Sequence, residues 1–515
     1  MKPRVPLLRW SALVVFVGVG VMLTGASAGA KKPPPPPPPG FTTSTYVKNY
    51  ANLVNGSEMS LTPEDVVATV DGGWTALAIT SAGAEVSWLV KASAFGKPQW
   101  QEEIGCLNGA PGDYANGVSL QRTSDGGYVL GGGTVGCGSG SVCPELSGLQ
   151  CGLIEKLDSA GAVVWARVYA AAADGTGFTA IRQTGDGGFV AVGTGTDASQ
   201  RPGALIVKLD GDGNVQWQRQ LGPTSTSYAL FETVQPTSDG GYLAAGEFND
   251  GSTNSLGQPL MSVLAVKFDA AGNIVWQHGF NDVGPAGVTA TEHVHSLVQT
   301  SDGGYAIGGD WNDSTSPGTC CQGALLLKLT PAGPIQWQQA YSGGVYCFFN
   351  GYSETCNTIG GGVYSLHQTS DGGYQLAGDS NLELTDETPL VPWLAKVDAN
   401  GALVWQEQDY QSLPRTGRPL SEYFAASTLT PAGPLAIGST ENYSNGRNEL
   451  LGVQTDTNGV VGACSQIHPA STLAAINPGL AQLTPGFTGN AGTTSESSSP
   501  VHVQSTTTTA TASQC

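Results

Sequence analysis

The sequence predicts an all-β fold built from seven copies of a four-stranded antiparallel unit. The first observation behind this prediction is a recurring Thr-Ser-Asp-Gly-Gly-Tyr segment flanked by alternating apolar residues, whose intact, varied or worn copies are anchored at Asp71, Asp125, Asp186, Asp239, Asp302, Asp371 and Pro431. The second is a Lys-Leu-Asp-x-x-Gly-x-x-x-Trp segment that follows six of the copies, with Lys and Trp nine residues apart, as in Lys208 and Trp217. The third is composition, since 73 glycines and only 12% charged residues are typical of turn-rich β proteins.

Each half of the repeat is predicted to form a β-hairpin. An Asp-Gly pair between apolar alternations is a strong hairpin signal and favours a type I′ turn. In the second half, Asp-x-x-Gly places a glycine where left-handed backbone is needed. Four strands repeated at spacings between 53 residues (Asp186 to Asp239) and 69 residues (Asp302 to Asp371) are typical of a β-propeller. We therefore expect a seven-bladed β-propeller of four-stranded antiparallel blades over residues 61–465.

The seventh repeat is degraded at its end. Ala463 stands where the tryptophan is expected, so the fourth strand predicted over residues 460–463 is weak. Residues 42–50, which precede the first repeat, have the composition of a strand. We expect this segment, within a linker over residues 31–60, to pair with the seventh blade and close the ring.

Both ends of the chain differ in composition from the repeats. Residues 1–30 combine a basic start, an apolar run and small residues, which predicts a cleaved signal peptide, with an uncleaved anchor as the alternative. Seven prolines over residues 33–39 predict a stiff polyproline II spacer. Residues 466–515 are rich in Ser and Thr and lack apolar periodicity, so we expect a disordered tail. The expected location is extracellular or periplasmic, with no membrane span after cleavage.

The repeats resemble those of many bacterial secreted β-propeller proteins, in which a Val-Lys-Leu-Asp-x-x-Gly-Asn segment recurs once per blade. Residues 206–214 and 266–273 are the closest matches, and the resemblance covers residues 61–465. It implies a propeller in an extracytoplasmic setting. It implies no activity, because such repeats serve as surface, adhesion and scaffold modules.

The ten cysteines are expected to form disulfides in an exported chain. Eight of them fall in two groups of four, within loops that a propeller places on one face, and two lie near the tail: Cys106, Cys137, Cys143 and Cys151; Cys320, Cys321, Cys347 and Cys356; Cys464 and Cys515. The pairing within each group stays open. A zinc site is the alternative, but the spacings contain no Cys-x-x-Cys pair.

A loop around residues 341–352 is the richest in aromatic residues. Tyr346, Phe348, Phe349 and Tyr352 stand beside Asn and Ser, a mixture that suits a glycan or a protein partner. The alternative is that the two phenylalanines fill a small core of the loop itself.

A second candidate site is the mouth of the channel that a propeller encloses. His293 and His295 stand two apart on a predicted strand, so their side chains are expected to point the same way and to share a metal. The position aligned with His295 is occupied in the other repeats by Glu64, Val118, Thr179, Glu232, Tyr364 and Phe424. Glu64, Glu232 and the two histidines are therefore the candidate ligands of a divalent cation, and solvated channel lining is the alternative. Apart from such a cation, no cofactor is predicted.

The function expected from the sequence is binding without catalysis. The formal net charge of −20 disfavours nucleic acid as a partner. No catalytic residues can be assigned, because residues 31–515 contain no Gly-x-Ser-x-Gly elbow and no phosphate-binding loop. We expect a secreted or cell-surface propeller that binds a protein, a glycan or a surface through its Cys-rich loop face. The alternative is a propeller enzyme, a hydrolase or a quinone- or metal-dependent oxidoreductase, with its site at the channel mouth.

Overall fold

The computed structural model consists of strands and turns, and the residues it describes include no helix that is long and apolar enough to cross a membrane. All of them belong to one unit, residues 42–515. Residues 1–44, with the expected signal peptide and proline spacer, lie outside the described residues. The structure describes residues 45–54, 57–81, 85–105, 114–135, 150–171, 175–196, 202–222, 228–249, 251, 253, 257, 259–282, 291–313, 321–342, 345–349, 354–358, 361–381, 390–408, 423–442 and 447–461, and the backbone of six short strands between 474 and 512.

Six four-stranded antiparallel units follow one another along the chain, and the seventh takes its fourth strand from the N-terminal segment. The first two units are also joined by a short parallel pairing of β5 with β7. The strands of the seven units are β3 (Ser60–Ala68), β4 (Trp74–Ser81), β5 (Glu85–Ala92), β6 (Pro98–Gly105); β7 (Tyr114–Arg122), β8 (Tyr128–Val135), β9 (Cys151–Leu157), β10 (Val163–Ala171); β11 (Gly177–Gln183), β12 (Phe189–Thr196), β13 (Pro202–Leu209), β14 (Val215–Gly222); β15 (Tyr228–Pro236), β16 (Tyr242–Asn249), β17 (Ser262–Phe268), β18 (Ile274–Asp282); β19 (Thr291–Gln299), β20 (Tyr305–Asp313), β21 (Cys321–Leu329), β22 (Ile335–Ser342); β25 (Val363–Gln368), β26 (Tyr374–Asn381), β27 (Leu390–Val397), β28 (Leu403–Gln408); and β29 (Tyr423–Thr430), β30 (Gly433–Asn442), β31 (Arg447–Gln454) with β1 (Tyr46–Val54).

The first hairpin of six repeats turns differently from the predicted type I′ geometry. In the second unit, Gly126 N–H donates to Thr123 O and Thr123 N–H donates to Gly127 O. The two central residues are therefore Ser124 and Asp125, and Gly126 follows them with a φ of 88°. A type I turn followed by a left-handed glycine is the usual three-residue hairpin loop. The prediction of Asp-Gly as the central pair is wrong because the Asp side chain holds this longer turn in place.

That Asp side chain joins the two hairpins in six of the repeats. Asp186 Oδ1 accepts hydrogen bonds from Thr184 Oγ1 and Gly188 N, and Lys208 Nζ lies 2.9 Å from Asp186 Oδ2. The lysine also donates to the carbonyl of Leu209. The same Lys–Asp clamp occurs in six repeats: Lys91–Asp71, Lys156–Asp125, Lys208–Asp186, Lys267–Asp239, Lys328–Asp302 and Lys396–Asp371. The motif residues of the repeat are thus explained by the fold.

The Lys–Asp clamps predict a loss of stability in acid. In Asp239, burial alone would raise the pKa, but hydrogen bonds from Thr237 and Lys267 lower it to about 2. A folded-state pKa below the unfolded value of about 3.9 gives stability that is complete above pH 4–5 and is lost as the pH falls toward 2. We expect the melting temperature to fall over this range. The Asp239→Asn variant should show a shallower fall, and an unchanged pH profile would contradict this assignment.

Neighbouring sheets meet where a tryptophan packs on a glycine turn. A Cβ on Gly459, in the last described turn, would lie 2.5 Å from the ring of Trp405 in the preceding sheet, so only glycine fits there. The equivalent tryptophans of the first five sheets also meet an aromatic residue of the next sheet, usually edge to face, an arrangement that stabilises packing beyond the area it buries. These ring pairs are Trp100–Tyr128, Trp165–Phe189, Trp217–Tyr242, Trp276–Tyr305 and Trp337–Tyr374.

The N-terminal strand β1 takes the place of the fourth strand expected over residues 460–463. It pairs antiparallel with β31, as the composition of the segment suggests, and Tyr46 lies opposite Gln454. In the other sheets a lysine stands opposite the tryptophan at this point, as Lys208 does opposite Trp217. Tyr46 therefore occupies the position of the tryptophan that the seventh repeat lacks. Val460 and Val461 are outside the strands.

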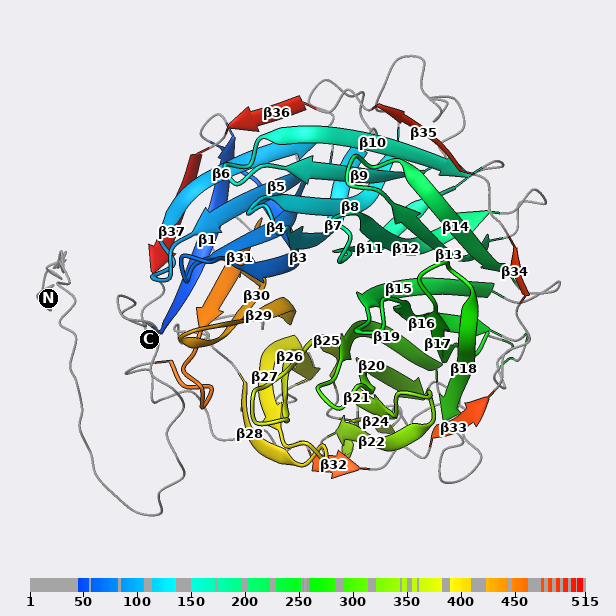
Figure 1. Cartoon of the computed structure of the whole chain (residues 1–515). Helices are drawn as coiled ribbons and strands as arrows, with labels where there is room; N and C mark the ends of the chain where they lie inside the picture. Colours follow the sequence, from blue (N-terminus) through cyan, green and yellow to red (C-terminus); the bar gives the residue numbers. More distant parts are fainter. Residues whose placement is uncertain are drawn as a thin grey trace, which may run out of the picture. The chain divides into compact units, whose positions relative to one another are not determined.

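The first strand of each sheet contacts the first strand of the next, and β29 of the last sheet contacts β3 of the first. Figure 1 shows these inner strands facing one another, with the orange β29–β31 sheet beside the blue β3–β6 sheet. The strand β1 also contacts the first sheet directly, because Tyr50 Oη donates to Gly96 O at 2.8 Å and Trp74 Nε1 donates to Tyr46 Oη at 2.6 Å.

The C-terminal segment contains six short strands, which differs from the disordered tail expected over residues 466–515. Their backbones are those of β32 (Ala474–Ile476), β33 (Leu480–Leu483), β34 (Thr488–Asn490), β35 (Thr494–Ser498), β36 (His502–Ser505) and β37 (Thr507–Ala512). Each pairs with the outermost strand of a sheet (Figure 1). The expectation rested on the lack of apolar periodicity, but a strand added to a sheet edge is held by backbone hydrogen bonds, which need no apolar side chains.

Candidate functional site

Seven β-bulges bring one residue of each inner strand to a common cavity. In each first strand, the pairing register shifts by one residue near its middle, as it does between Val294 and Ser296 of β19. The residues at the seven shifts are Glu64, Val118, Thr179, Glu232, His295, Tyr364 and Ala425. All seven line a cavity of about 590 Å³, together with Asp379 and Tyr423. Because bulges re-aim side chains, they explain why these positions converge.

The sequence alignment predicts six of these seven positions and misses the last. It places Phe424 in the ring, but Phe424 is fully buried in the core beside Leu394 and Ala436, and Ala425 lines the cavity. The cause is the hairpin turn of the seventh repeat, where Thr430 pairs with Gly433 and the loop is shorter than in the other repeats.

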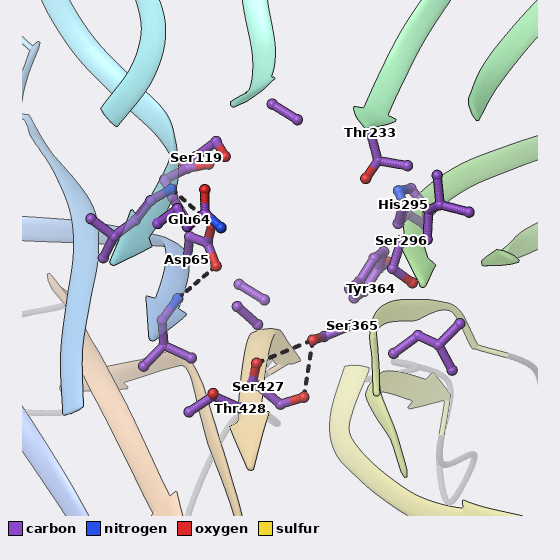
Figure 2. A pocket seen from close by; sticks show the side chains of 18 of the residues that line it. Glu64, Asp65, Ser119, Thr233, His295, Ser296, Tyr364, Ser365, Ser427 and Thr428 are labelled. Atoms are coloured by element: carbon purple, nitrogen blue, oxygen red, sulfur yellow. Dashed lines mark hydrogen bonds between the residues drawn. The ribbon is translucent and has the colours of Figure 1, made fainter. Parts of the chain in front are cut away.

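Two hydrogen-bonded pairs stand on one wall of the cavity. His295 Nε2 lies 2.6 Å from Asp310 Oδ1, and Tyr364 Oη donates to Asp379 Oδ2 at 3.2 Å. The rings of His295 and Tyr364 meet edge to face at 4.7 Å. Figure 2 shows Glu64, Asp65 and Ser119 across the cavity from His295 and Tyr364. Neighbouring groups thus fix the orientation of this polar wall.

The two glutamates of the ring hold their protons more tightly than free carboxylic acids do. Burial and the neighbouring Asp65 and Glu85 raise the pKa of Glu64 to about 8. Burial and Glu247 raise the pKa of Glu232 to about 7, although His295 and His293 oppose the shift. Near neutral pH these carboxyls can therefore both donate and accept hydrogen bonds.

The two histidines do not share a site, contrary to the sequence expectation. His293 Nδ1 lies 3.0 Å from Glu247 Oε1 of the preceding sheet, while His295 bonds to Asp310 of its own sheet. His293 is also not among the residues that line the cavity. The bulge at His295 breaks the two-residue alternation on which the expectation rested.

No group of three or more His, Cys, Asp or Glu side chains within the described ranges is arranged to hold a metal ion. The divalent cation expected at Glu64, Glu232, His293 and His295 therefore gains no support from the arrangement of these residues.

A deeper layer of polar residues lies below the bulges, and sequence reasoning did not single it out. Asp65 accepts hydrogen bonds from the backbone N–H groups of Val66 and Leu120, both at 2.8 Å. Arg182 donates to Ser119 Oγ at 3.1 Å, and His367 Nε2 donates to Ser427 O at 2.7 Å. These residues line the lower cavity of about 310 Å³. The sequence pattern that could have identified this layer is a polar side chain one or three residues after the bulge, at positions that do not pack in the hydrophobic core.

The cysteine and aromatic candidates are described only in part. Cys151 begins β9 and is disulfide-bonded, and Cys321 begins β21. Cys347 and Cys356 lie opposite each other where β23 (Val345–Phe349) pairs with β24 (Glu354–Thr358). The backbones of Tyr346, Phe348 and Phe349 lie on β23. The remaining candidates are outside the described residues: Tyr352, Cys106, Cys137, Cys143, Cys320, Cys464 and Cys515.

Comparisons with known proteins do not assign a family. No family model and no curated protein matches the chain. Among solved structures, a mannose phosphorylase from Leishmania mexicana, MPT-4 in complex with phosphate ion, is 11% identical with a TM-score of 0.29, and the match covers 57% of this chain and 92% of that one. The tail fibre of Staphylococcus aureus phage P68 is 9% identical with a TM-score of 0.16, and the match covers 71% of this chain and 96% of that one. Likenesses this weak carry no argument about function.

Proposed function

We propose that the seven sheets close into one seven-bladed β-propeller. The proposal is supported by the contact of β29 with β3, which links the last sheet to the first. It is supported further by Tyr46 and Tyr50, which meet Gly96 in the first sheet as Trp405 meets Gly459. Propellers of this kind present variable loops around a central channel.

We propose further that the protein is exported and binds a glycan, without catalysis, at the mouth of this channel on its loop face. The observation that carries the proposal is the convergence of seven bulge residues on one cavity. Protonatable carboxyls, an imidazole and two tyrosines offer donors, acceptors and ring faces to a polyhydroxylated ligand. The end of β20, on which Asp310 meets His295, also carries Asp313, which pairs with Cys321. A larger glycan or a protein-linked glycan is therefore the proposed partner.

A glycan array with the purified protein tests this function. We expect a set of related glycans to bind, and the Tyr364→Ala variant to bind them at least tenfold more weakly, because Tyr364 supplies both a ring face and a positioned hydroxyl. The Glu102→Gln variant, on the outer strand β6, is the matched control and should bind as the unaltered protein does. Equal glycan binding by the two variants would contradict a binding site at the channel mouth.

A hydrolase acting at the same mouth is the second candidate. The short contact between His295 Nε2 and Asp310 and the pKa of Glu232 near 7 are the observations that favour it, since general acid–base catalysis needs groups that titrate near the working pH. Release of new reducing ends from a bound glycan, abolished by Glu232→Gln, would establish the hydrolase over the binding protein.

A further inference from the structure

The strands of the C-terminal segment pair with the outermost strands of six sheets. From the fifth sheet to the first, they do so in the reverse of the order in which the sheets follow along the chain. In turn, β32 pairs with β22, β33 with β18, β34 with β14, β35 with β10, β36 with β6 and β37 with β1. All six pairings are antiparallel, and Figure 1 shows the red strands on the outside of the sheets. The segment thus runs from the fifth sheet back to the first and ends on the seventh.

Five of the six tail strands pair only with the C-terminal, loop-side half of the outer strand they meet, whereas β37 pairs with most of β1, from Lys48 to Leu53. On β10 the pairing spans Arg167 to Ala171, and on β18 it spans Gly279 to Asp282. Each of these five outer strands therefore has a covered half and an open half.

The sequence of the tail suits this path. Its prolines at 478, 485 and 500 fall between the strands, where no N–H is needed for a ladder. The last strand, Thr507–Ala512, consists of threonine and alanine, and threonine is favoured in strands. An unpaired sheet edge is a template for other strands, so a protein with this many edges gains from covering them.

We propose that the loop-side halves of the outer strands are strand-acceptor edges, and that the C-terminal segment 474–512 is the ligand that fills them within the same molecule. The chemical class of ligand is an extended strand rich in Thr, Ser and Ala, with Glu496 as its one acidic residue. This inference is independent of the glycan proposal.

The terminal strand β37 acts as a latch on the N-terminal strand. It pairs with residues Lys48 to Leu53 of β1, whose other edge pairs with β31 from Tyr46 to Tyr50. The strand that supplies Tyr46 and Tyr50 to the first sheet is therefore held on both sides. Loss of β37 frees backbone N–H groups of β1 to exchange with solvent.

Hydrogen exchange on the full-length chain tests the latch. The double variant Thr509→Pro/Ala510→Pro removes two adjacent N–H groups, at least one of which bonds across the ladder, since bonded and non-bonded pairs alternate. We expect amides of residues 48–53 to exchange at least tenfold faster in this variant, while the amides of β12 stay unchanged. The Ser513→Pro/Gln514→Pro variant, beyond β37, is the matched control.

A synthetic peptide with the sequence of residues 501–513 should restore protection of β1 when added to the double variant. Unchanged exchange in the variant, or protection that the peptide fails to restore, would overturn the proposal. The unaltered protein is expected to be a monomer in light scattering. A dimer that the double variant dissociates would show that the tail is exchanged between copies and would overturn the assignment to one molecule.

Discussion

Replacing Tyr50 by alanine is expected to cost about 3–5 kcal/mol of unfolding free energy, the range for large buried aromatic side chains. Tyr50 is fully buried, its ring meets Trp74 edge to face at 5.3 Å, and its hydroxyl donates to Gly96 O. The hydrogen bond from Trp74 Nε1 to Tyr46 Oη also joins β1 to the first sheet, but Tyr50 supplies a fully buried ring to this contact, so its removal should cost more than that of any single hydrogen bond. Chemical denaturation followed by tryptophan fluorescence measures the loss.

Two matched variants isolate the contact made by Tyr50. Tyr50→Phe keeps the ring and loses one hydrogen bond, which costs about 1 kcal/mol. Lys48→Ala, on the same strand, removes an exposed hydrogen bond to Phe95 O and a cation–π contact with Tyr46, and it should cost less than Tyr50→Ala, about 1 kcal/mol. A Tyr50→Ala variant as stable as Lys48→Ala would show that β1 does not hold the first and last sheets together.

Replacing Glu155 by valine is expected to stabilise the protein by about 2–4 kcal/mol at neutral pH and by more in alkali. Glu155 is 1% exposed on β9, and neither of its carboxyl oxygens has a hydrogen-bond partner among the described residues. The other six sheets carry an apolar, fully buried residue at this position: Val90, Val207, Val266, Leu327, Ala395 and Val453. Valine therefore suits the site in shape and chemistry.

The pH dependence of stability identifies the carboxyl as the cause. Burial raises the pKa of Glu155 to about 8, far above its unfolded value of about 4.3. The folded state thus binds the extra proton, and stability falls as the pH rises from 5 through 8, by up to about 1.4 kcal/mol per unit. Glu155→Gln should remove this slope while leaving an unpaired polar group. Parallel stability–pH curves for Glu155→Val and the unaltered protein would contradict the assignment.

The repeat itself could be predicted from sequence because its residues act locally. The Lys–Asp clamp, the turn glycines and the tryptophans recur at fixed spacing, and each stabilises its own hairpin or the next sheet. The replacement of a missing tryptophan by Tyr46 could not be derived from spacing, because Tyr46 and its partner Gln454 lie at opposite ends of the repeat array. The tail strands could not be predicted for another reason. Backbone pairing at a sheet edge requires no particular pattern of apolar and polar side chains.

The candidate site was predicted in part. Alignment of the repeats placed Glu64, Glu232 and His295 at equivalent positions. The prediction holds because every inner strand has its bulge at this position, so the three side chains line the same cavity. It could not separate His293 from His295, since the bulge that divides them has no sequence signature. It misplaced Phe424, since a shorter turn shifts the register of the seventh repeat. The partners that tune the site, Asp310 and Asp379, lie on second strands and become visible only when the sheets are assembled.

The pairing of Tyr46 with Gln454 also bears on how the protein matures. The partner of β1, β31, belongs to the seventh repeat, and β37, which borders β1 on its other side, is synthesised later still. Contacts between residues so distant in sequence form slowly, because closing the large loop between them costs conformational entropy before the contacts can stabilise the fold. A growing chain therefore carries β1 without its partner until β31 has been synthesised. Assembly of the last sheet is a late event, and export in an unfolded form is compatible with it.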